Sequence, residues 1–386
     1  MATYYVSDDT GSDSNTGTEA SPLKSISQAF YNVGMATAST IIVNDSAVYD
    51  VTNHSTPHAN PDSSNQIIAT TGHLPTYLTI KAGDGCTPIF DGGHVADFLM
   101  SVWNNWTIQG LEIRKFGGSP PGYAIQQTAG NQNSHVQDCT IHAITGSAIY
   151  LLKDNTTVQR CTIYDCTNKA VYGLYQFVVK NNLIYDCQGE AIWGGISGVN
   201  TADTVVRHNT IRNCPSAGST ASARRYAIST RTDCRYNIVT NAVCATAAIY
   251  TYASNSEHSY NLVSGTLGYG SNNPDDYSSG AADGAGTGDL TDEDPQFVSI
   301  AGGRWGPSGS VDNDFSLQQT SPCMRAAVGS DVTDDLEQKS REWDYSHDVI
   351  GVDSANNPEM GCLEFNEAKV SGVVTDTVGA VLGVSD

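Results

Sequence analysis

Two acidic residues occupy the same place in consecutive copies of a short sequence phrase. Asp165 and Asp186 each follow, by two residues, an isoleucine that recurs through the middle of the chain. If the copies stack on one another, the two carboxylates lie about 5 Å apart, near the separation of the catalytic pair in a retaining glycosidase. Glu190 is a third carboxyl close by in the sequence. Asp165, Asp186 and Glu190 are therefore candidate catalytic residues, although aspartates in turns more often cap backbone amides.

The same stretch also offers the groups that a polysaccharide lyase needs. Such an enzyme uses a base to abstract a proton beside a cation that neutralises a uronate. Lys180, Arg207, His208 and Tyr185 are of the required types and lie in neighbouring copies of the phrase. Hydrolysis and elimination both stay open, because no further motif decides between them.

A basic ladder is predicted beside these residues. Lys180, Arg207 and Arg235 each precede a recurring apolar residue by four positions. Stacked like charges repel one another, and either an anionic ligand or interleaved carboxylates would relieve the repulsion. Arg224 and Arg225 lie in the longest insertion of the repeat, and long loops of a solenoid often line its functional face. We expect an anionic glycan at these side chains, with a solvated basic edge as the alternative.

The bases of this region stand out against the rest of the chain. The 386 residues carry 19 Lys and Arg against 41 Asp and Glu, a net charge of −22, yet residues 150–265 carry ten bases against seven acids. So acidic a protein should not bind nucleic acid, and an anionic membrane surface should repel it. No run of 18 apolar residues indicates a transmembrane helix, and residues 1–7 do not resemble a signal peptide.

A second recurring phrase, Ala-[Ile/Val]-x, ends in an aromatic residue in four copies. These residues are Tyr150, Tyr172, Trp193 and Tyr250. Because strand residues alternate between two faces, the rings point outward when the Ile or Val points into the core. They would form a row at a spacing of about 4.8 Å. Sugars stack on flat rings with polar tips, so the row is a candidate glycan-binding site; rings that only shield the sheet are the alternative.

The two phrases alternate strictly, which defines the elements that position these side chains. The first phrase ends in Ile141, Ile163, Ile184, Ile211, Val239 and Val263, at spacings of 22, 21, 27, 28 and 24 residues. Each repeat thus holds at least two short β-branched strands separated by turns, with no helical period between them. We predict a coil of roughly 8–11 turns, in which equivalent strands pair in parallel.

An asparagine recurs two residues before the last apolar residue of the first phrase. Asn182, Asn209, Asn237 and Asn261 share this position. Equivalent residues of successive coils stack directly, so these side chains should form a buried ladder. Each amide would bond to its neighbours and satisfy the polar groups of the turn.

The chain has ten cysteines, an even number that would suggest disulfides in a secreted protein. At least five lie at ladder positions: Cys139 and Cys161 in one ladder, and Cys166, Cys187 and Cys214 in another. We expect most thiols to be free, because cysteine packs there as a small hydrophobe. Folding in a reducing cytoplasm is then expected. No spacing resembles a zinc site, and we expect no metal and no cofactor.

Together these phrases resemble the right-handed parallel β-helix of the pectate-lyase-like superfamily, in its bacterial and phage members. Residues 4–26 look like the opening of such proteins, with a capping helix that starts at Ser21 and stops at Gly34, and segments of residues 294–364 look similar to their tail. The resemblance implies an all-β, right-handed parallel β-helix solenoid with an N-terminal capping helix and an irregular C-terminal tail. Lyases, hydrolases, epimerases and phage spikes share this fold, so it does not choose a function.

Four regions are expected along the chain. Residues 1–38 hold the first strand and the capping helix, residues 39–265 the coils, and residues 266–365 an acidic, loop-rich region. Residues 366–386 give two short strands that cannot stand alone in water. We therefore expect this last pair to contact another chain and to serve as an attachment tail.

Our first hypothesis is a bacteriophage virion component, a spike-like or decorating β-helix that recognises glycans. Such a protein is made in the host cytoplasm and carried on the virion, with a glycan and other virion or self chains as its partners. The alternative is an extracellular polysaccharide lyase or glycoside hydrolase that acts on an acidic polysaccharide. A third hypothesis is a purely structural coat element.

Overall fold

The structure is a computed structural model. It describes residues 2–33, 38–50, 66–68, 77–94, 96, 98–102, 105–117, 122–127, 133–152, 155–194, 204–215, 226–230, 233–244, 246–251, 257–268, 275–279, 287–299, 314–318 and 320–323.

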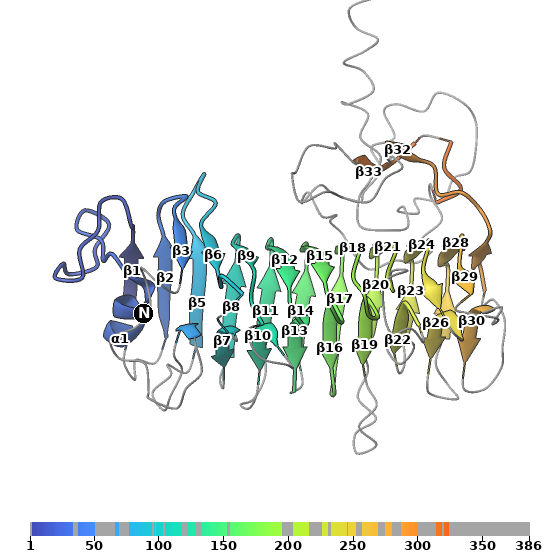
Figure 1. The fold of residues 1–386 in the computed structure, drawn as a ribbon, viewed down its shortest axis with the longest axis horizontal. Coiled ribbons are helices and arrows are strands. Elements are labelled where there is room, and N and C mark those ends of the chain that lie inside the picture. Colours follow the sequence, from blue (N-terminus) through green and yellow to red (C-terminus); the bar gives the residue numbers. More distant parts are fainter. Residues whose placement is uncertain are drawn as a thin grey trace, which may run out of the picture.

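Three parallel sheets run along the molecule, and each turn of the coil adds one strand to each of them (Figure 1). Sheet 1 consists of β1 (Ala2–Val6), β2 (Ser39–Val43), β5 (Tyr77–Ala82), β8 (Asn105–Gln109), β11 (Ser134–Gln137), β14 (Thr156–Gln159), β17 (Phe177–Lys180), β20 (Val205–Arg207), β23 (Asp233–Arg235) and β27 (Glu257–Ser259). Sheet 2 consists of β3 (Val48–Asp50), β6 (Ile89–Asp91), β9 (Glu112–Arg114), β12 (Thr140–Ile144), β15 (Thr162–Cys166), β18 (Leu183–Tyr185), β21 (Thr210–Arg212), β24 (Ile238–Thr240), β28 (Leu262–Ser264) and β31 (Leu290–Thr291). Sheet 3 consists of β4 (Gln66–Ile68), β7 (Phe98–Val102), β10 (Tyr123–Gln127), β13 (Ser147–Leu151), β16 (Val171–Gly173), β19 (Ile192–Gly194), β22 (Ile228–Thr230), β26 (Ala247–Thr251) and β30 (Asp275–Ser279).

The chain passes from sheet 1 to sheet 2 to sheet 3 and then returns to sheet 1 one rung further along. This confirms the predicted parallel β-helix, and its right-handed sense is the one that connections between parallel strands of one sheet almost always adopt. Sheet 1 has ten strands, which agrees with the predicted 8–11 turns. Two smaller pairs complete the described strands: β25 (Val243–Cys244) with β29 (Leu267–Gly268), and β32 (Phe297–Ser299) with β33 (Asp314–Leu317).

The core consists of stacked β-branched side chains, because each short strand sends its apolar residue inward at the same height. In sheet 2 the register stacks Ile141, Ile163, Ile184 and Ile211, and all four are fully buried. Burial of each such side chain contributes roughly 1.5–3 kcal/mol. Since every rung repeats the pattern, each added rung covers the apolar side chains of the one before it.

The predicted asparagine ladder is present at the turn between sheets 1 and 2. The backbone N and the side-chain Nδ2 of Asn182 donate to Oδ1 of Asn209 at 3.1 and 2.9 Å. Asn209 donates in the same way to Asn237, and Asn237 to Asn261, at 2.9–3.0 Å. Nδ2 of Asn209 also donates to the backbone oxygen of Val179 at 2.9 Å. Each amide therefore ties three rungs together inside the core.

Other groups close the two ends of the ladder. At the N-terminal end the backbone N of Cys161 donates to Oδ1 of Asn182 at 2.9 Å. At the other end Asp289 replaces an asparagine, and its Oδ1 accepts from N and Nδ2 of Asn261 at 2.7 and 3.1 Å. Oδ2 of the same carboxylate lies 2.7 Å from Nδ1 of His258. The sequence did not predict Asp289, because it lies outside the repeated phrase.

The single described helix, α1 (Ile26–Val33), packs against β1 and β2 at the N-terminal end of the coil (Figure 1). The predicted start at Ser21 is wrong, because the backbone of Leu23 pairs with β1 in two hydrogen bonds of 2.9 Å. Ser25 is the N-cap instead, and its Oγ accepts from the backbone N of Gln28 at 3.1 Å. No helix among the described residues is long and apolar enough to cross a membrane.

The C-terminal pair β32–β33 covers part of the outer face of sheet 2 (Figure 1). Phe297, Leu317 and Cys323 pack in one buried cluster with Leu183 and Leu262, which point outward from β18 and β28. The outward apolar side chains of sheet 2 at these rungs are therefore covered by the C-terminal segment. This contact explains why sheet 2 carries apolar residues on both of its faces there.

The rungs continue past residue 265, where the sequence placed the end of the coils. β31 pairs with β28 in sheet 2, and β30 pairs with β26 in sheet 3. The predicted strand pair at 366–386 and the tenth cysteine, Cys362, lie outside the described residues. The nine described cysteines are free thiols, and eight of them are buried.

Asn209→Ala should lower the free energy of unfolding by about 3–5 kcal/mol, because it leaves several buried hydrogen-bonding groups without partners. Urea unfolding of the parent and the variant measures the loss. Asn241→Gly is the matched control: Asn241 is exposed, and its φ of 53° suits glycine, so the change should cost less than about 1 kcal/mol. Equal losses in the two variants would contradict the ladder's role.

Candidate functional site

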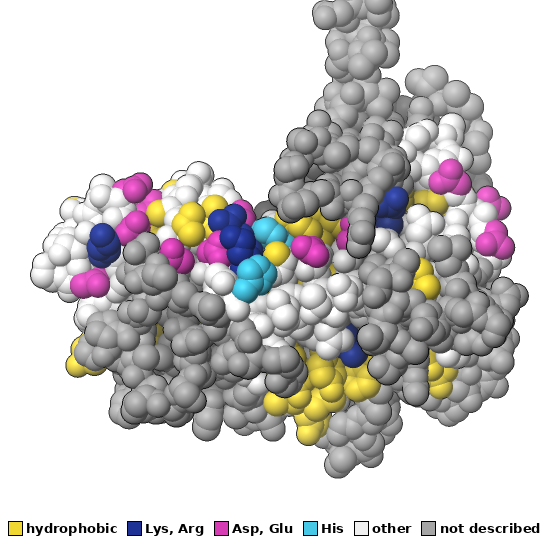
Figure 2. Space-filling view, in the orientation of Figure 1, with side chains coloured by type: hydrophobic (Ala, Val, Ile, Leu, Met, Phe, Trp, Pro, Cys, Tyr) yellow, Lys and Arg dark blue, Asp and Glu magenta, His cyan; other side chains and the backbone are white. Residues whose placement is uncertain are grey.

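The predicted aromatic row lies on the outer face of sheet 3. The register pairs Tyr150 with Tyr172 and Tyr172 with Trp193 on three consecutive rungs. Ser229 and then Tyr250 follow on the next two rungs. The four aromatic side chains are half-buried. Apolar and aromatic side chains gather below the middle of the coil, in the region where Figure 1 places β13 and β16 (Figure 2).

Two tyrosines that the sequence reasoning missed extend the row. Tyr123 stacks on Tyr150, with ring centroids 4.5 Å apart and planes at 11°. Tyr226 stacks on Tyr250 in the same manner, at 4.6 Å and 17°. Both stand directly before the Ala-Ile phrase of their own rung. A tyrosine at that position reaches the outward side chain of the next rung. It lies outside the repeated Ala-[Ile/Val]-x phrase, so the phrase alone could not predict its place in the row.

The rings of the row largely face one another. Tyr150 and Tyr172 have centroids 4.8 Å apart and planes at 37°. Rings stacked along the coil axis direct their edges and hydroxyl groups outward, so a sugar meets those parts before it meets a ring face. Trp193 lies at 71° to Tyr172, with centroids 4.7 Å apart, and ends the stack. Trp193 is thus the ring whose orientation differs most from its neighbours.

A buried ion pair lies at the Trp193 end of the row. Nζ of Lys169 lies 5.4 Å from the ring centroid of Tyr172 and 5.7 Å from that of Trp193. The same Nζ lies 3.2 Å from Oε2 of Glu190, a residue that is only 3% exposed. A buried carboxylate requires such a partner. Glu190, a predicted catalytic candidate, therefore holds a cation against the aromatic row, and Lys169 was not predicted.

The basic ladder lies on sheet 1, on a different face from the aromatic row. The register stacks Lys180, Arg207 and Arg235, as the spacing predicted. Asp233 supplies an interleaved carboxylate: its Oδ2 pairs with Nη2 of Arg207, and its Oδ1 lies 3.2 Å from Nε of Arg235. Of the three cations, Lys180 has no ion pair with a described carboxylate. The two arginines of the longest insertion, Arg224 and Arg225, lie outside the described residues.

Asp165 and Asp186 stack as predicted on sheet 2: Asp165 lies near the end of β15, and Asp186 directly follows β18. Both have a φ of 53°, in the left-handed region, and so does Asn213 of the next rung with 52°. Nδ2 of Asn213 donates to Oδ1 of Asp186. Desolvation raises the pKa of both carboxyls, although the hydrogen bond from Asn213 and the charge of Arg212 partly oppose the shift of Asp186. The structure brings these two carboxyls together, whereas Glu190 is engaged with Lys169.

The four residues proposed for a lyase are divided among separate surfaces. Lys180 and Arg207 are neighbours on sheet 1, while Tyr185 points outward from sheet 2 and is 5% exposed. Burial raises the pKa of the Tyr185 hydroxyl strongly. His208 is fully buried at the turn between these sheets and stacks on Tyr236 with centroids 4.9 Å apart. The structure therefore does not gather these four side chains around one exposed point.

Basic and histidine side chains also gather on the upper edge of the coil, in the region of β9 and β12 (Figure 2). Arg114 and Lys115 lie 2.8 and 2.9 Å from Oδ2 of Asp91. Although burial opposes it, these two bonds hold the pKa of Asp91 below its ordinary value. Nη1 of Arg114 and Nε2 of His142 lie 3.0 and 3.2 Å from Glu112. Arg114 and Lys115 are thus paired with carboxylates of the same surface.

No group of three His, Cys, Asp or Glu side chains that could hold a metal occurs in the part of the chain that the structure describes.

A family model described as a right handed beta helix region matches residues 102–278, which agrees with this architecture. Among solved structures, a lacto-N-biosidase from Eubacterium ramulus is 14% identical with a TM-score of 0.48 and covers 69% of this chain; the match spans 57% of that chain. A pectate lyase is 15% identical with a TM-score of 0.49, over 95% of this chain and 97% of that one.

An alginate lyase from Paenibacillus sp. str. FPU-7 is 13% identical with a TM-score of 0.35, over 72% of this chain and 97% of that one. A search of curated protein sequences found no match. The chain spans little more than half the length of the biosidase.

Asp186→Asn should stabilise the protein at neutral pH by about 0.5–1 kcal/mol. The pKa of Asp186 is raised in the folded state, so ionisation costs stability. This loss of stability is absent at pH values below the pKa of Asp186 in the unfolded chain. It reaches its full size at pH values above the pKa of Asp186 in the folded protein. The gain should therefore appear as pH rises above about 4. Urea unfolding across pH measures it.

Asp292→Asn is the matched control for this prediction. Asp292 also has a left-handed backbone, with a φ of 57°, but it is exposed. Its replacement should leave the pH dependence of unfolding unchanged. A destabilisation by Asp186→Asn at every pH would show that the carboxylate holds the turn together rather than straining it.

Proposed function

We propose that the outer face of sheet 3, over the middle coils, binds a glycan. The observation that carries the proposal is the row of four aromatic rings on consecutive rungs, from Tyr123 through Tyr150 and Tyr172 to Trp193. Tyr123 is buried, but Tyr150, Tyr172 and Trp193 are half-buried, and contiguous apolar patches on a protein surface often mark binding sites. The strip combines apolar ring edges with hydroxyl groups, which match the C–H and O–H groups of a sugar.

The hydroxyl groups of the strip are suited to hydrogen bonding with neutral sugars. Burial raises the pKa of the Tyr123 hydroxyl to about 12, and the neighbouring tyrosines contribute to this shift. Burial also raises the pKa values of Tyr150 and Tyr172. All three therefore stay protonated at any physiological pH and can both donate and accept. Lys169 lies beside the Trp193 end of the strip, where its ammonium group is already paired with Glu190.

A second candidate function is hydrolysis of a glycan by Asp165 and Asp186. The specific observation is that two carboxyls on adjacent rungs both have raised pKa values. A carboxyl that retains its proton can act as the general acid, while its ionised neighbour acts as nucleophile or base. This pair lies at the ends of β15 and β18 in sheet 2, and Glu190 is not needed for it.

We also propose that the protein is a component of a bacteriophage virion, with an extracellular enzyme as the alternative. The free state of the nine described cysteines supports folding in a reducing compartment. A contact with other chains through residues 366–386 is proposed from the sequence alone. A purely structural role predicts no glycan binding at all, so the experiment below tests it as well.

Trp193→Ala should weaken glycan binding by about 1–3 kcal/mol, because it removes the largest ring of the strip and the apolar area that it buries. Calorimetric titration of the purified protein with a panel of neutral and acidic oligosaccharides measures the change. Tyr172→Phe keeps the stack and removes one hydroxyl group, so its smaller loss isolates the hydrogen bond. Thermal unfolding of each variant separates lost binding from lost folding.

Tyr31→Ala is the matched control, since Tyr31 is 63% exposed on α1, away from the row. It should leave both binding and stability unchanged. The same panel is assayed for reducing ends and for unsaturated products, which tests hydrolysis and elimination. If Trp193→Ala binds every oligosaccharide as tightly as the parent does, the strip only shields the sheet.

A further inference from the structure

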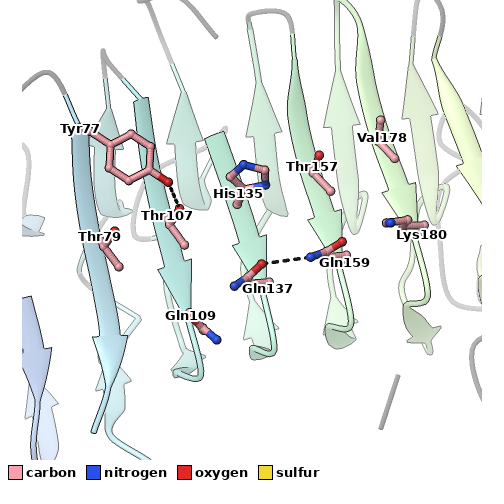
Figure 3. A pocket seen from close by; sticks show the side chains of 10 residues that line it. All are labelled: Tyr77, Thr79, Thr107, Gln109, His135, Gln137, Thr157, Gln159, Val178 and Lys180. Atoms are coloured by element: carbon pink, nitrogen blue, oxygen red, sulfur yellow. Dashed lines mark hydrogen bonds between the residues drawn. The ribbon is translucent and has the colours of Figure 1, made fainter. Parts of the chain in front are cut away.

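A groove of about 590 Å³ lies on the outer face of sheet 1, across five rungs from β5 to β17 (Figure 3). One row of its lining is made of amides and ends in a cation: Gln109, Gln137, Gln159 and Lys180, one residue on each rung. The row continues beyond Gln109 to Lys81 on β5. Three neutral amides are thus flanked by a lysine at each end.

The amides of this row have free hydrogen-bonding capacity toward the groove. Nε2 of Gln159 donates to Oε1 of Gln137 at 3.0 Å (Figure 3). Nε2 of Gln109 donates to Oδ2 of Asp138 at 3.2 Å. Each amide has two donors and two lone pairs, so these bonds use only part of what it offers. The three side chains are half-buried and keep their positions through these contacts. A polar ligand along the groove would therefore meet prearranged donors and acceptors.

A second row, parallel to the first, adds hydroxyl groups and an imidazole. Thr79, Thr107, His135 and Thr157 occupy it on successive rungs. The hydroxyl of Tyr77 bonds to Oγ1 of Thr107 at 2.8 Å and fixes one end of the row (Figure 3). Burial lowers the pKa of His135, which is therefore neutral at pH 7 and able to both donate and accept.

The charge of the groove differs from that of the protein. The chain has 41 acidic residues and a net charge of −22, yet no carboxylate is among the described residues that line the groove. Lys180 has no described ion pair, in contrast to Arg207 and Arg235 beside it. Lys81 on β5 and Lys180 on β17 are four rung-to-rung steps apart, which places the two positive charges about 19 Å from each other. The groove is thus long, mostly neutral and sparsely positive.

We propose that this groove binds a linear oligosaccharide whose carboxylates are separated by neutral sugars. The chain of sugars lies along the coil axis, its hydroxyl and amide groups bond to the glutamine and threonine rows, and one carboxylate pairs with Lys180. A densely charged polyanion needs more cations than two. A peptide strand needs a free sheet edge, whereas the strands of the groove have paired neighbours on both sides. This site is independent of the aromatic row, which lies on sheet 3.

The test uses the full chain and three hexasaccharides in calorimetric titrations: hyaluronan, in which uronate alternates with a neutral amino sugar, neutral chitohexaose, and fully charged hexagalacturonate. Hyaluronan should bind most tightly, and added salt should weaken it more than it weakens chitohexaose. Tighter binding of hexagalacturonate would overturn the sparse-charge assignment. Equal binding of chitohexaose, or no binding of hyaluronan, would overturn the site.

Two variants localise the binding. Lys180→Gln should weaken hyaluronan binding about tenfold through loss of one charge-assisted hydrogen bond. Gln137→Glu keeps the acceptor for Gln159 but places a carboxylate in the middle of the groove, so it should weaken hyaluronan about tenfold or more and leave chitohexaose unchanged. Lys24→Gln, the same charge change at an exposed site outside the groove, is the control and should have no effect.

Trp193→Ala separates this proposal from the aromatic row. It should leave hyaluronan binding unchanged, whether or not it affects other sugars. If Trp193→Ala abolishes hyaluronan binding while Lys180→Gln and Gln137→Glu do not change it, the acidic sugar binds on sheet 3 and the groove proposal is wrong. Thermal unfolding curves that coincide for all variants exclude loss of folding as the cause of any change.

Discussion

The structure depends on a buried column of side-chain amides that holds successive rungs at one height. Asn182, Asn209, Asn237 and Asn261 each accept from the residue of the rung before and donate to that of the rung after, and Asp289 ends the column. A slip of one residue in any rung would leave several of these groups unpaired in the core and would turn its apolar side chains outward. The column therefore fixes the register, and the register fixes every outward row.

The three faces of the coil serve different purposes as a consequence. Sheet 3 carries the aromatic strip, sheet 1 the amide and threonine rows, and the later rungs of sheet 2 are covered by the segment around Phe297 and Leu317. On the outer faces of sheets 1 and 3, side chains contact the equivalent side chains of neighbouring rungs, as in the bond from Gln159 to Gln137. The same contacts stabilise the coil and prearrange a surface that is repeated along its axis.

Much of this architecture could be predicted from the sequence, because a repeated position in the chain is a repeated position in space. The asparagine ladder, the stack of Asp165 and Asp186, and the alignment of Trp193 with the tyrosines all follow from spacing alone. Contacts between residues outside the phrase could not be predicted. Lys169 over Trp193, Asp233 between two arginines and the late start of α1 depend on side chains from different rungs or on local caps that no repeat encodes.

Amide hydrogen exchange tests the central claim, that the amide column holds the register, most directly. The backbone N–H groups of Asn182, Asn209 and Asn237 bond to buried side-chain oxygens rather than to a neighbouring strand. If the column fixes the register, these amides exchange only through global unfolding, with the same free energy as the strand amides of the middle coils. Exchange through local opening, at free energies several kcal/mol below the global value, would show that the column follows the register and does not determine it.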